Sequence, residues 1–108
     1  MFLEKDNALL SRLITASKEG KLDWAPTGTT SSKFVTALSG KYVVSVGEQW
    51  VGSPSPEHYL RLETQDGISI QTLTDETYPD VKELYEFARR RALKVDEAID
   101  DILKELDS

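Results

Sequence analysis

Few side chains in this sequence could carry out chemistry, and His58 is the first to consider. It is the only histidine, and the chain contains no cysteine. A Ser-His-acid triad would have to use His58, which follows directly after the residues SPSPE at the predicted start of a strand. Zinc sites of the usual kinds need several histidine or cysteine ligands. We therefore interpret His58 as a histidine at a loop edge and predict no transition-metal site.

Two further chemical signatures are absent or incomplete. The sequence contains no G-x-x-x-x-G-K-[ST] and no G-x-G-x-x-G motif, so it signals no nucleotide cradle. The stretch DETYPD, residues 75–80, is acidic but lacks the spaced oxygen ligands and central glycine of a calcium loop. A capped helix start explains these acids better. We expect a protein that is not an enzyme and that uses no cofactor and no metal.

The most distinctive charge pattern lies near the carboxyl end of the chain. Arg89, Arg90, Arg91 and Lys94 come just before residues 96–108, which hold six carboxylates against one lysine, a net charge of −5. Consecutive helical residues point about 100° apart, so the three arginines do not form one phosphate-binding patch. The net charge of the whole chain, −6, also argues against binding to nucleic acid or to an anionic membrane.

Length and composition predict one ordinary globular domain over residues 1–108. The chain is 39% apolar and 30% charged, and its uncharged apolar runs extend over only a few residues, so we expect no membrane span. Glu4 and Asp6 stand where a signal peptide would be basic and then continuously apolar. We therefore expect the protein in the cytoplasm, which also fits the absence of cysteine.

The apolar pattern predicts a helix, four strands and a helical closing segment. Apolar residues recur at spacings of three and four from about Leu3 to Lys18, with Gly20 as a C-terminal cap. A polar connector, residues 20–33, follows. Four segments rich in β-branched and aromatic residues then form a meander, at 33–38, 41–50, 57–64 and 67–73. Ser39-Gly40 and Asp66-Gly67 suit tight hairpins.

Alternation along the strands assigns the two faces of the predicted sheet. We expect the core face to carry Phe34, Leu38, Tyr42, Val44, Val46, Leu60, Leu62, Ile68 and Ile70. We expect the other face, which is mixed in character, to face solvent. Helices must cover the core face, so the predicted fold class is α+β, a two-layer sandwich in the order α-β-β-β-β-α-α.

The closing segment raises the main structural question. From Pro79, apolar residues step by four and three through Val95 to Leu106. One straight helix over this span would be roughly 43 Å long, whereas a four-stranded sheet is only about 19 Å wide. Either the helix breaks or its far end packs on another chain. The basic residues before Asp96 and the acidic ones after it favour a break near residues 93–96, although no glycine or proline enforces one.

Several exposed side chains are candidates for binding a partner. Trp24 is expected over the edge of the core, and Trp50, which opens the loop WVGSPSP, either pins this loop to the core or stays exposed as a binding anchor. The candidate interaction residues are Trp50, Arg89, Arg90, Asp96, Asp100 and Asp101.

The chain resembles a family of small bacterial single-domain proteins to which no function is assigned. The resemblance rests on the opening helix, the residues GKLDW, the antiparallel meander and the closing LYEFARRRALKVDEAID. It implies a bacterial origin and a single α+β domain covering nearly the whole chain. It implies no activity and no binding residue.

Two functional hypotheses follow. The first is a non-enzymatic, cytoplasmic protein-interaction module, with a homodimer as one form, because the closing segment has more apolar length than one small sheet can cover. The alternative is an acidic inhibitor or immunity-type protein that neutralises a basic partner such as a nuclease, because opposite charges speed and orient association.

Overall fold

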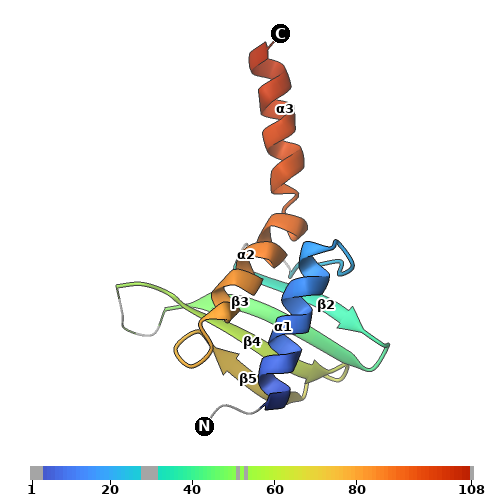
Figure 1. Cartoon of the computed structure of the whole chain (residues 1–108), viewed down its shortest axis with the longest axis vertical. Coiled ribbons are helices and arrows are strands. Elements are labelled where there is room, and N and C mark those ends of the chain that lie inside the picture. Colours follow the sequence, from blue (N-terminus) through green and yellow to red (C-terminus); the bar gives the residue numbers. More distant parts are fainter. Residues whose placement is uncertain (1–3, 28–31, 51, 53, 108) are drawn as a thin grey trace.

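The computed structural model describes residues 4–27, 32–50, 52 and 54–107. Along the chain lie α1 (Glu4–Lys18), β1 (Ala25–Pro26), β2 (Lys33–Leu38), β3 (Tyr42–Gln49), β4 (Glu57–Thr64), β5 (Ser69–Thr74), α2 (Asp80–Ala92) and α3 (Val95–Asp107). The strands form one antiparallel sheet in the order β1-β2-β3-β4-β5. Helices α1 and α2 cover one face of the sheet, and α3 points away from it (Figure 1). The predicted α+β fold is confirmed, with five strands in place of four.

Helix α1 packs on the sheet through the apolar stripe predicted for it. Leu10, Leu13 and Ile14 are buried, while Phe2, which we expected in the same stripe, lies outside the described residues. The helix ends as expected at Gly20, whose φ of 71° is the left-handed conformation that glycine adopts without a steric penalty. At the other end, the Asp6 carboxylate accepts a hydrogen bond of 3.1 Å from the Tyr78 hydroxyl. This bond ties the start of α1 to the segment that leads into α2.

The core forms where the middle of the sheet meets α2. Register places Phe34 opposite Val46, Val46 opposite Leu60, and Leu60 opposite Leu73, one residue from each of four strands. Helix α2 adds four buried side chains to this row: Val81, Leu84, Tyr85 and Ala88. Their spacing of three and four residues places them on one face of the helix. The first half of the closing segment therefore packs its apolar side against the core, as predicted.

The prediction for β5 is wrong, because a bulge changes which residues face the core. Leu62 pairs with Gln71 but Glu63 pairs with Ser69, so Ile70 is an extra residue in this ladder. A bulge of this kind shifts the alternation by one residue, and Leu73 becomes the buried side chain of β5. Ile68 and Ile70, which we expected in the core, are 63% and 51% exposed.

The opposite face of the sheet is less open to solvent than its mixed sequence suggests. Gly47 lies opposite Tyr59, and a side chain at position 47 would meet the Tyr59 ring, since a Cβ there would lie 2.4 Å from the phenol oxygen. The absent side chain leaves room for the Tyr59 ring beside Gly47, and the Arg61 guanidinium carbon lies 4.8 Å from the centroid of this ring. Ser45 is also buried, and it donates a hydrogen bond of 3.1 Å to Glu63.

The predicted connector contains the additional strand, β1, and buries a tryptophan. Ala25 pairs with Val35 and Pro26 with Phe34 at the edge of the sheet, where a proline without an N–H is tolerated. Trp24, just before β1, is buried as expected, at 4% exposure, and its indole N–H donates to Ser17 at 3.0 Å. Residues 28–31 of the connector lie outside the described part of the chain.

The predicted break in the closing segment is confirmed between α2 and α3. The Leu93 and Lys94 N–H groups donate to the carbonyls of Arg89 and Arg91, at 2.9 and 3.3 Å, which closes the last turn of α2. Lys94 then adopts a φ of 54°, a left-handed conformation that costs a non-glycine residue about 1–2 kcal/mol. This residue redirects the chain, so α3 does not continue along the sheet.

Helix α3 does not cover the sheet, contrary to the expectation that both ends of the chain would do so. None of its residues is buried, and it extends from the end of α2 away from the two-layer body, with the carboxyl terminus at its far tip (Figure 1). In the part of the chain that the structure describes, no helix combines the length and apolar character that crossing a bilayer requires.

The core and α3 should therefore respond very differently to the same truncation. Leu84 is fully buried and Ile102 is 58% exposed. We expect Leu84→Ala to lower the free energy of unfolding by about 2–5 kcal/mol, because it opens a cavity. Ile102→Ala should change it by less than about 0.5 kcal/mol. Urea denaturation of dilute protein measures both values, and a large loss for Ile102→Ala would show that α3 belongs to the core.

Candidate interaction site

The apolar side chains of α3 form a stripe that the rest of the described chain leaves uncovered. Ile99, Ile102, Leu103 and Leu106 are 44%, 58%, 50% and 74% exposed. Val95, Ile99, Ile102 and Leu106 recur at spacings of four, three and four, and Leu103 follows four residues after Ile99, so all five lie along one side of the helix. A soluble monomer rarely leaves such a continuous apolar surface open, and surfaces of this kind mark interaction sites. The stripe is the first component of the candidate site.

The remaining surface of α3 is strongly acidic. The helix carries six carboxylates against the single cation Lys104. All of these side chains are exposed. Helix α3 is therefore an amphipathic rod with one apolar side and a negative remainder, and any partner must match both properties.

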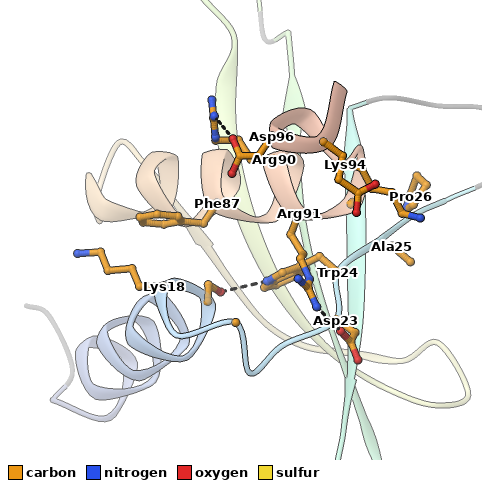
Figure 2. A pocket seen from close by; sticks show the side chains of 14 residues that line it. Lys18, Asp23, Trp24, Ala25, Pro26, Phe87, Arg90, Arg91, Lys94 and Asp96 are labelled. Carbon is orange, nitrogen blue, oxygen red and sulfur yellow. Dashed lines mark hydrogen bonds and ion pairs between the residues drawn. The ribbon is translucent and has the colours of Figure 1, made fainter. Parts of the chain in front are cut away.

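A groove of about 730 Å³ lies at the base of α3. Its walls come from the end of α1, the segment leading into β1, the last turns of α2 and the first turn of α3 (Figure 2). The residues lining it are Ser17, Lys18, Gly20, Asp23, Trp24, Ala25, Pro26, Phe87, Arg90, Arg91, Ala92, Lys94, Asp96 and Glu97. The groove carries four cations against three carboxylates, two of which belong to α3, so it is weakly cationic where α3 begins.

Polar contacts already hold several of these cations in place. Arg90 pairs with Asp96 across the junction between α2 and α3. Arg91 pairs with Asp23 at 3.0 Å, and both pairs are drawn as dashed lines in Figure 2. The Lys18 ammonium lies 5.6 Å from the centroid of the Phe87 ring. These exposed contacts are individually weak, about 0–1 kcal/mol each, and can exchange for contacts with a partner.

The six candidate residues from the sequence lie in four places. Arg90 and Asp96 form the ion pair at the groove, whereas Arg89 pairs with Glu86 at 3.6 Å and does not line the groove. Asp100 and Asp101 lie exposed on α3. The structure therefore brings two of the six together.

The sixth candidate, Trp50, lies elsewhere and does not pin its loop. It follows directly after β3 and is 65% exposed, so its placement agrees with the exposed alternative rather than with the core contact. Trp50 does not line the groove. Val51 and Ser53 of the same loop lie outside the described residues.

We expected His58 at a loop edge, but it is buried on the core face of the sheet as the second residue of β4. It is 5% exposed. Its Nδ1 lies 3.0 Å from the Asp75 carboxylate and its Nε2 lies 3.3 Å from the Glu48 carboxylate. His58 is thus the centre of a three-residue polar network that joins β3, β4 and the segment just after β5.

This network does not form a metal centre. The two carboxylates bind opposite nitrogens of one ring, so they do not converge on a common point. Across the described residues, no group of three or more histidine, cysteine, aspartate or glutamate side chains is arranged to hold a metal ion. His58 also lies outside the groove at the base of α3.

Tyr85 packs against this network from α2. Its ring centroid lies 4.8 Å from that of His58 and 5.8 Å from that of Phe34. Burial raises the pKa of the Tyr85 phenol above its usual value of 10, and the negative charges of Glu48 and Glu86 act in the same direction, against the weaker effect of Arg89. The neutral phenol is therefore the form that the folded state favours.

Sequence reasoning missed two features of this region. The groove depends on Lys18, Trp24 and Phe87, which are separated by up to 69 residues and are joined only by the packing of α1 on α2. The His58 network depends on the strand register that places Glu48 opposite His58. The sequence contains Glu48, His58 and Asp75, but it does not show that the two carboxylates contact the histidine.

Comparison with known proteins adds no relative: no family model, no curated protein and no solved structure matches this chain. The resemblance to small bacterial proteins stays a prediction, and the functional argument rests on the geometry of the chain itself.

The His58 network gives a first test of this region. We expect His58→Leu to lower the free energy of unfolding by about 1–3 kcal/mol, because Glu48 and Asp75 lose the polar partner that they share. Adding Glu48→Gln and Asp75→Asn should restore part of this loss by removing the unpaired charges. Thermal and urea unfolding at neutral pH measure both variants. A triple variant less stable than His58→Leu alone would contradict this account.

The Tyr85 pKa gives a second test, at alkaline pH. A phenol whose folded pKa is raised stabilises the fold fully below its unfolded pKa of about 10, and this contribution is lost as the pH rises through the folded pKa. We therefore expect the free energy of unfolding to fall more steeply above pH 10 for the unmodified chain than for Tyr85→Phe. Tyr42→Phe, at an exposed site, is the matched control and should follow the unmodified chain.

Proposed function

We propose that this protein is a non-enzymatic, cytoplasmic interaction module that presents α3 to a protein partner. The observation that carries the proposal is the uncovered apolar stripe of Ile99, Ile102, Leu103 and Leu106 on a helix that buries none of its residues. The core forms without α3, so folding of the body gives no reason for four large apolar side chains there.

The length of α3 supports the same proposal. An isolated helix shorter than about 12–15 residues is only marginally stable in water, and most helices gain their stability from packing. Helix α3 has 13 residues. A partner that covers the stripe would supply the packing that the body does not supply, as in complexes where an amphipathic helix lies in an apolar groove.

The chemistry of the remaining site is consistent with binding rather than catalysis. His58 is occupied by Glu48 and Asp75 and is buried. The groove at the base of α3 offers exposed cations and aromatic rings but no nucleophile paired with a base, which acyl transfer would need. These features favour a surface that recognises another macromolecule.

The acidic face of α3 favours a second candidate function. Six carboxylates on a helix that projects from the body would attract a basic protein and orient its approach. An inhibitor or immunity-type protein that neutralises a nuclease uses such complementarity. This candidate predicts contact through Asp100 and Asp101, whereas the leading proposal predicts contact through the apolar stripe.

Photo-crosslinking from single positions in α3 separates the two. A benzophenone amino acid replaces Ile102, on the stripe, or Asp101, on the acidic face, in the full chain expressed in its source cells. We expect adducts from position 102 and few from position 101. Adducts mainly from position 101, with a basic protein, would favour the inhibitor. The absence of adducts from both positions would contradict the interaction module.

A further inference from the structure

We propose that the partner of α3 is the α3 of a second copy of this chain, paired with it in antiparallel orientation. This pairing specifies the partner of the stripe and therefore rests on the proposed function. It follows from three properties of α3: the spacing of its apolar residues, the distribution of charge along it and its length.

The apolar residues of α3 form a seam that complements itself. Val95, Ile99, Ile102 and Leu106 alternate spacings of four and three residues, as the inner positions of a coiled coil do. When Ile99 of one antiparallel helix lies opposite Ile102 of the other, Val95 lies opposite Leu106. Twofold symmetry repeats both layers, so every seam residue meets a large apolar side chain.

Charge selects the antiparallel orientation over the parallel one. A parallel pair would align the six carboxylates of each α3 with the same carboxylates of the second copy and would bring the two cationic bases together. Like charges that are brought side by side on two paired helices destabilise the pair. In the antiparallel pair, the acidic tip with Glu105 and Asp107 lies beside Lys94 at the base of the second copy, where Arg90 and Arg91 are also exposed.

The residues that flank the seam tolerate this arrangement. In the same register, Asp96 lies next to the second copy's Leu103, and Ala98 lies next to the second copy's Glu105. The flanks therefore contain no pair of like charges across the interface. Most other carboxylates, including Asp100 and Asp101, lie on the outer side of the helix, where water solvates them.

The length of α3 sets the strength of the dimer. Thirteen residues span about 20 Å, which is about two heptads rather than the three or four heptads of a stable coiled coil. The contact therefore lies at or below the lower end of specific interfaces, about 1,200 Å². We expect a weak dimer with a dissociation constant of about 10–100 µM.

Disulfide trapping tests the orientation directly, because the chain has no cysteine of its own. The full-length variants Val95→Cys and Leu106→Cys are mixed under mild oxidation, and the products are separated by mass. We expect the mixed disulfide to exceed both homodisulfides by at least about tenfold, because equivalent residues of an antiparallel pair lie about 16 Å apart, beyond disulfide reach. A dominant Leu106→Cys homodisulfide would show parallel pairing and overturn the proposal.

Sedimentation equilibrium from about 10 to 500 µM tests the dimer without a crosslink. The unmodified chain should dimerise with rising concentration, and Ile102→Asp should weaken the dimer by at least about tenfold. Asp101→Asn, one residue away on the outer side, is the control and should not weaken it. A strictly monomeric unmodified chain overturns the self-pairing. If Ile102 nevertheless crosslinks to another protein, the interaction module stands and only the choice of partner fails.

Discussion

The packing of α2 across the sheet is the interaction on which the rest of the structure depends. Its four buried side chains meet the row that Phe34, Val46, Leu60 and Leu73 form across four strands. Helix α1 packs against α2, and the ring of Tyr85, a residue of α2, lies against the buried His58 imidazole. The groove and α3 both begin at the last turn of α2. The position of this helix therefore fixes the core, the polar network around His58 and the direction in which α3 leaves the body.

The extent of the sheet explains why the closing segment divides into two helices with different surroundings. Helix α2 has 13 residues, so its length of about 20 Å already matches the width of the sheet. A continuation in the same direction would project past the last strand in any case. The left-handed residue Lys94 instead turns the chain, and the pair between Arg90 and Asp96 joins the two helices at this turn. The apolar period continues into α3, but no surface of the body remains to cover it.

Several elements could be predicted because their causes are local. The cap at Gly20, the hairpin at Ser39 and Gly40 and the break before Asp96 follow from backbone preference and from charge near helix ends. Which residues of β5 face the core could not be predicted. The bulge at Ile70 arises from the pairing of β4 with β5 and not from either strand alone. The exposure of Ile102 could not be predicted either. An apolar period of 3.6 residues shows that a helix has an apolar side, but it does not show what that side contacts.

The two halves of the closing segment, α2 and α3, bury their apolar side chains to very different extents. Both halves repeat apolar residues with the same period, yet Leu84 is fully buried and Leu106 is 74% exposed. Replacement of the α3 stripe by polar residues would cost the body almost nothing and would make the surface better solvated. The cationic base and the acidic tip are likewise unnecessary for the core, but they have the opposite signs that an antiparallel pair of these helices brings together. The seam and the charges are the two independent features on which the proposed contact between two copies of the chain rests.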